Sequence, residues 1–120
     1  MKLSSAFAII RKRFEAQGGT GEAGHVYHPT TGRVDVVGAL AMHKGWSPEV
    51  RPGRRTPCGF VHYITEKSWS DANLLATKLL KRDPGAYYAL YDHHTRDGAL
   101  DVGTPAYAAF LRDLREAMRD

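Results

Sequence analysis

Residues 87–102, YYALYDHHTRDGALDV, decide which fold the sequence predicts. The dipeptide Asp97-Gly98 is a strong signal for a two-residue hairpin turn, because both residue types accept the backbone angles that such a turn requires. Three tyrosines precede it and a short apolar run follows it. We therefore expect a β-hairpin formed by Tyr87–Arg96 and Ala99–Val102.

A second hairpin and one single strand are predicted upstream. His25–His28 and Arg33–Val37 flank the turn-forming sequence PTTG, and Gly59–Thr65 is a short run rich in β-forming residues. Trp46–Pro57 contains three prolines and three arginines, so we expect an irregular loop there. The sequence thus predicts about five strands in all.

Amphipathic periodicity predicts about three helices, over Ser4–Gln17, Trp69–Arg82 and Pro105–Arg119. Gly38–Lys44 is ambiguous: its Ala, Leu and Met residues favour a short helix, but the segment is also compatible with an extension of the preceding strand. Hairpins with few crossovers indicate a mostly antiparallel sheet with the helices packed on it. We expect an α+β fold in a single domain, residues 1–120.

The composition excludes several classes of protein. The 42% of hydrophobic and 25% of charged residues are typical of a globular domain. Cys58 is the only cysteine, which rules out a disulfide within the chain and a cysteine-rich zinc site. The apolar stretch Ala6–Ile10 is too short for a signal peptide, and no apolar run approaches the length of a membrane span. We expect a cytoplasmic protein without a cofactor.

Basic residues are concentrated in one half of the chain. The net charge is +4, and residues 1–60 carry nine basic and four acidic side chains. Arginine binds phosphate or carboxylate through paired hydrogen bonds, and a nearby tryptophan ring can stack on a base. A solvated loop and a helix with a basic end give the same charge count. The predicted partner-binding residues are Lys44, Trp46, Arg51, Arg54, Arg55, Arg11 and Arg13.

The predicted C-terminal hairpin brings together a second candidate cluster. Asp92 and His94 share one strand face, and Asp101 lies opposite His94. Such a cluster can hold a metal ion or exchange protons, although a cross-strand ion pair is the commoner use of these residues. His25 and His28 are poor partners for one metal on a strand, because a spacing of three places them on opposite faces unless the segment is a loop or a bulge.

These observations favour a small non-catalytic binding protein with an acidic partner, either nucleic acid or an acidic protein surface. Accessory or inhibitor proteins of phages and mobile elements are one version of this hypothesis. No phosphate-binding loop, nucleophile elbow or helical zinc motif is present in the sequence. One alternative is a small enzyme that uses the Asp92, His94 and Asp101 cluster, alone or with a metal ion. The other alternative is a self-assembling structural subunit.

Overall fold

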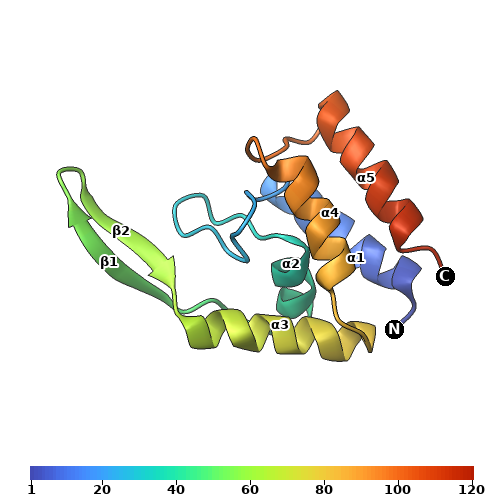
Figure 1. Ribbon diagram of the computed structural model, residues 1–120, viewed down its shortest axis with the longest axis horizontal. Helices are drawn as coiled ribbons and strands as arrows, with labels where there is room; N and C mark the ends of the chain where they lie inside the picture. Colours follow the sequence, from blue (N-terminus) through green and yellow to red (C-terminus); the bar gives the residue numbers. More distant parts are fainter.

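Five helices and one two-stranded sheet form the protein, whose computed structural model describes residues 1–120 (Figure 1). The helices are α1 (Leu3–Gln17), α2 (Val36–His43), α3 (Glu66–Leu80), α4 (Gly85–Thr95) and α5 (Pro105–Ala117). The strands are β1 (Val50–Thr56) and β2 (Gly59–Ile64), which pair antiparallel. The fold is α+β, but the prediction of about five strands and about three helices is wrong. None of the helices combines the length and the apolar character needed to cross a bilayer.

Aromatic rings from three helices form the centre of the core. Phe14 of α1, Tyr91 of α4 and Phe110 of α5 are completely buried. Their ring centroids lie between 5.7 and 6.1 Å apart, in the tilted and edge-to-face arrangements that aromatic rings prefer. Burial of each of these side chains contributes on the order of 2 kcal/mol to stability. Helix α2 packs against α1 and α3 with residues 36–41 buried.

The three predicted amphipathic helices are confirmed, with shifted bounds. Helix α3 begins at Glu66, three residues before the predicted start at Trp69, because Thr65 caps it. The Thr65 hydroxyl accepts the Ser68 N–H at 3.1 Å. Helix α5 begins at Pro105, as predicted, and Thr104 caps it.

Helix α4 replaces the predicted C-terminal hairpin, so the prediction drawn from the Asp-Gly signal is wrong. Tyr87, Tyr91 and Thr95 are all buried, and a spacing of four residues places side chains on one face of either a helix or a strand. The Asp-Gly dipeptide follows the helix. Gly98 has a φ of 127°, and its N–H donates to the Thr95 carbonyl at 3.0 Å. The positive φ therefore turns the chain after a helix and does not join two strands.

Residues 21–35, which we call the histidine loop, replace the predicted N-terminal hairpin. Only one isolated antiparallel bridge remains there, between Tyr27 and Val34. One side chain also holds Val34: the Gln17 amide donates to the Val34 carbonyl at 2.9 Å and accepts the Val34 N–H at 3.0 Å. Backbone hydrogen bonds flank the bridge, from the His28 N–H to the Arg33 carbonyl at 2.9 Å and from the Asp35 N–H to the Val26 carbonyl at 3.2 Å, and no further bridge extends them into a pair of strands.

Helix α2 confirms the short helix predicted over Gly38–Lys44 and begins two residues earlier. Asp35 caps it, with its Oδ1 accepting the Gly38 N–H at 2.9 Å. Gly38 also permits close packing, because a Cβ atom there would lie 2.4 Å from the Val26 carbonyl oxygen. The predicted strand Arg33–Val37 is therefore wrong, because Asp35 is a helix cap and α2 begins at Val36.

Strand β1 occupies most of the segment predicted to be a loop, so that prediction is also wrong. Its partner β2 confirms the single predicted strand. The register shifts at residues 53 and 54, which form a bulge opposite Val61. Pro52 is tolerated in β1 because the sheet has only two strands and Pro52 lies beside the bulge. Pro57 and Cys58 form the connecting turn.

Candidate functional site

The β1–β2 hairpin, residues 50–64, projects from the helical body, and we call it the basic arm. Figure 1 shows it at one end of the molecule, whose longest dimension is 47 Å. Every residue of the two strands is exposed except Thr56 and Ile64, which are half-buried. The side chains of the arm are therefore available to another molecule.

Two pairs of an arginine and an aromatic residue lie across the arm. The strand register places Arg51 opposite Tyr63 and Arg55 opposite Phe60. Phe60 is 56% exposed and Tyr63 is 49% exposed, which is unusual for large apolar rings. Because Phe60 and Tyr63 are three residues apart on one strand, the two pairs face opposite sides of the arm. The bulge gives β1 the extra residue needed to follow this alternation.

The three arginines of the arm differ in their partners. Arg51 forms an ion pair with Glu49, with an Nη2–Oε1 distance of 2.6 Å. Arg54 and Arg55 are exposed and form no ion pair. Unpaired guanidinium groups keep all their donors free for an anion, so Arg54 and Arg55 are the stronger phosphate-binding candidates.

Trp46 does not offer its ring to a partner, because it is only 9% exposed. Its indole Nε1–H donates to the Ser68 carbonyl at 3.0 Å, and the Ser68 hydroxyl accepts the Glu49 N–H at 3.0 Å. Trp46 and Ser68 therefore fix the base of the arm to α3. The prediction that Trp46 stacks on a base is wrong, because its ring is buried.

The remaining predicted partner-binding residues do not join the arm in one surface. Arg11 lines a cavity of about 850 Å³ between α1 and α5 and forms an ion pair with Glu15 at 3.3 Å. Arg13 lines a different cavity, between α1 and α2. Lys44 is exposed at the end of α2. The basic residues predicted as one group are thus divided between the arm and several faces of the body.

The predicted Asp92, His94 and Asp101 cluster does not form, because residues 85–95 are helical. His94 Nε2 lies 3.0 Å from Asp113 Oδ2 on α5. Asp101 Oδ1 accepts a hydrogen bond from Arg33 Nη1 at 2.8 Å. His94 and Asp101 therefore have separate partners, and Oδ1 of Asp92 is buried without a hydrogen-bond partner.

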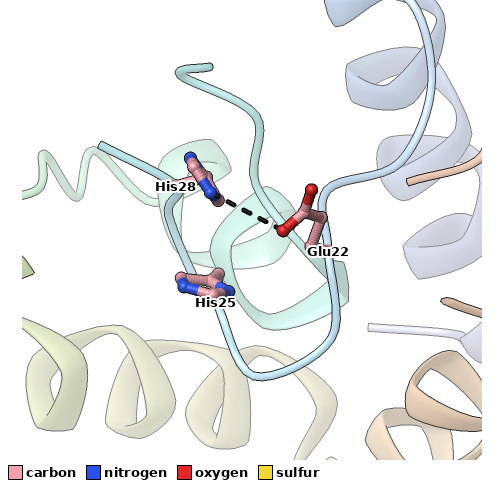
Figure 2. A group of neighbouring side chains, drawn as sticks. All are labelled: Glu22, His25 and His28. Atoms are coloured by element: carbon pink, nitrogen blue, oxygen red, sulfur yellow. Dashed lines mark ion pairs between the residues drawn. The ribbon is translucent and has the colours of Figure 1, made fainter. Parts of the chain in front are cut away.

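A different group of metal-ligating side chains comes together in the histidine loop. Figure 2 shows Glu22, His25 and His28 turned toward one another, with His28 Nε2 at 3.7 Å from Glu22 Oε2. One ligand atom from each residue lies within 4.8 Å of the others, and the two ring centroids are 4.7 Å apart. His25 and His28 were poor metal partners only on a strand, and this segment is a loop. No motif or spacing in the sequence pointed to Glu22 as a metal ligand.

The histidine loop lies next to the basic arm. A cavity of about 270 Å³ is lined by His25 and His28 on the loop side and by His62 and Tyr63 of β2 on the arm side. Trp69, 44% exposed at the start of α3, lines it as well. Residues about 35 positions apart in the chain therefore share one concave surface.

One carboxyl group is buried in the body. Burial raises the pKa of Asp35 to about 7, against the effect of its backbone hydrogen bonds, and nearby Asp92 raises it further. Oδ1 of Asp35 caps α2, whereas Oδ2 has no hydrogen-bond partner. Burial also raises the pKa of the neighbouring Tyr88 to about 12. Asp35 is completely buried, so we connect its pKa with stability and not with ligand binding.

Comparison with known proteins identifies no relative. No protein-family model matches the chain, and neither a curated protein nor a solved structure is similar to it at a significant level. Functional inference therefore depends on the arm, the histidine loop and the cavity between them.

Proposed function

We propose that this protein binds single-stranded nucleic acid through the basic arm. The supporting observation is the pairing of an arginine with an exposed aromatic ring on each side of the arm, Arg51 with Tyr63 and Arg55 with Phe60. Proteins that bind single strands combine cations along the backbone with aromatic rings under the bases.

The two chemical components of the arm have separate roles in this proposal. Arg54 and Arg55 contact phosphate oxygens, because both are exposed and lack acidic partners. Phe60 and Tyr63 stack on bases, and a ring can stack only on a base that is not enclosed in a duplex. This requirement favours a single strand over double-stranded DNA.

The marginal stability of an isolated hairpin also supports a binding role. Two-stranded hairpins without a packed face are barely stable in water. The arm exposes Val61, 49% accessible, in addition to its two aromatic rings. A strand bound to one side of the arm would cover part of this apolar surface and stabilise the arm, whereas an arm without a partner has no such compensation.

The test is fluorescence anisotropy with labelled single- and double-stranded oligonucleotides over a range of salt concentrations. The Arg54→Ala/Arg55→Ala variant should bind more weakly and flatten the salt dependence. The log–log slope should fall by about 0.7 for each phosphate that the variant no longer neutralises. Phe60→Ala and Tyr63→Ala should each weaken binding by about 1–3 kcal/mol with the salt slope unchanged.

A matched control removes the same charge elsewhere. Arg82 and Arg96 are exposed and form no ion pair, so Arg82→Ala/Arg96→Ala should bind like the parent. Absence of binding at low salt, or an equal weakening in this control, would refute the proposal. An acidic protein partner would then become the better hypothesis for the arm.

A further inference from the structure

The conformation of the histidine loop brings Glu22, His25 and His28 into one group. The His25 N–H donates to the Glu22 carbonyl at 3.3 Å, which closes a turn between these two residues. The loop is held to the body at its start, where the Thr20 N–H donates to the Leu100 carbonyl at 2.8 Å. Two imidazoles and one carboxylate therefore converge from a short segment with a fixed base.

The hydrogen bonding of His25 suits a metal ligand. Its Nδ1 lies 3.1 Å from the Ala23 carbonyl oxygen, which can only accept a hydrogen bond. The ring proton is therefore on Nδ1, and the lone pair of Nε2 is free. Metal-binding histidines commonly have their second ring nitrogen bonded in this way to a backbone carbonyl, which orients the ring.

His28 has the opposite arrangement and must change when a metal binds. Its Nδ1 accepts the N–H groups of Thr30 and Thr31, at 3.2 and 3.3 Å. Both hydrogen bonds are long, and both threonines are exposed, so water can replace the ring nitrogen. Coordination through Nε2 moves the ring proton to Nδ1 and releases these two N–H groups.

We propose that Glu22, His25 and His28 bind a divalent transition-metal ion, with zinc as the expected ion. Two imidazole nitrogens and one carboxylate oxygen are ligands that zinc accepts in proteins. Ligand atoms around tetrahedral zinc are about 3.3 Å apart, so the group within 4.8 Å must contract by up to about 1.5 Å. None of the three ligands belongs to the proposed nucleic-acid interface, although Tyr63 of that interface lines the adjoining cavity.

Three protein ligands leave a coordination position for water or another small ligand. The cavity beside His25 and His28 has a volume of about 270 Å³, which is enough space for several water molecules. His62 and Tyr63 on the opposite wall come from the arm. A metal ion here would order the loop that forms one wall of the cavity.

The test is calorimetric titration of zinc into chelator-treated protein without nucleic acid. Cys58→Ser serves as the parent, because the exposed thiol of Cys58 is itself a metal ligand. We expect one zinc ion per chain, and at least roughly tenfold weaker binding for each of the variants His25→Ala, His28→Ala and Glu22→Gln.

Two further histidines provide matched controls. His43 and His93 are exposed and lie outside the loop, so His43→Ala and His93→Ala should bind zinc like the parent. The proposal is overturned if about 100 μM zinc gives no saturable binding, or if the loop variants bind as tightly as these controls.

Imidazole ¹⁵N spectra of the parent test the same site without relying on the variants. Zinc should shift the Nε2 resonances of two histidines, and His28 should change its protonated nitrogen from Nε2 to Nδ1. Shifts confined to other histidines would overturn the assignment. Because nucleic acid is absent from both measurements, failure here would leave the proposed function of the arm unaffected.

Discussion

The helical body and the basic arm follow opposite rules of burial. In the body, Phe14, Tyr91 and Phe110 are completely buried and in mutual contact. In the arm, Phe60 and Tyr63 are about half exposed and have no core beneath them. The body is thus explained by its own packing. The composition of the arm is not, and this difference directs the search for a partner to the arm.

The largest expected effect on stability is the loss of an aromatic side chain from the body. Phe110→Ala should lower the free energy of unfolding by about 3–5 kcal/mol, because it leaves a cavity between α1, α4 and α5. Urea denaturation followed by circular dichroism measures this decrease. A decrease below about 1 kcal/mol would show that the body is not packed around these rings.

The buried carboxyl of Asp35 should make the stability of the body depend on pH. Because its pKa rises from 3.8 to about 7 on folding, the folded protein holds a proton that the unfolded chain releases. Stability from this group is therefore present below about pH 4 and declines as the pH rises to about 7, by up to about 4 kcal/mol.

Asp35→Asn should remove this component, while the amide oxygen still caps α2. Urea denaturation between about pH 5 and 8 should show a decline of roughly 3 kcal/mol in the parent beyond any decline in the variant. Parallel curves for the two proteins would contradict a raised pKa at Asp35.

The joint between body and arm should give an intermediate effect. Trp46→Phe keeps most of the buried ring but removes the hydrogen bond to the Ser68 carbonyl, which should cost about 1–2 kcal/mol. The substitution should accelerate amide hydrogen exchange more in residues 50–64 than in α5. Uniform acceleration throughout the chain would argue against a joint at Trp46.

The smallest effect is expected in the arm itself. Phe60→Ala should change the free energy of unfolding by less than about 0.5 kcal/mol, because its ring is already in solvent. The measurement is the urea denaturation used for Phe110→Ala. A decrease comparable to that of Phe110→Ala would mean that the arm packs against something in the free protein.

Sequence patterns predicted the body better than the arm. Helices α1, α3 and α5 each have one apolar stripe and a polar remainder, so their periodicity was informative. Helix α4 was not recognised because the spacing of Tyr87, Tyr91 and Thr95 fits a strand as well as a helix. Packing against α5, the next helix, and against α1, which is remote in sequence, resolves this ambiguity.

Strand β1 could not be recognised because pairing with β2, and not burial, defines it. Its sequence VRPGRRT shows no alternation of apolar and polar residues and contains a proline and a glycine. The arginines of the candidate site were found from charge alone. Trp46 was misassigned, since a ring beside charged residues gives no sign of its own burial. The Glu22, His25 and His28 group depended on a loop conformation that the sequence did not predict.

The turn at Pro57 and Cys58 has a practical consequence for solution experiments. The only thiol of the protein lies at the outer end of the arm, and it is exposed. Air oxidation would join two molecules end to end and produce a covalent dimer that reflects no contact between their bodies. Under reducing conditions, the same thiol accepts a single fluorophore or spin label, which would report the motion of the arm from its most distant point.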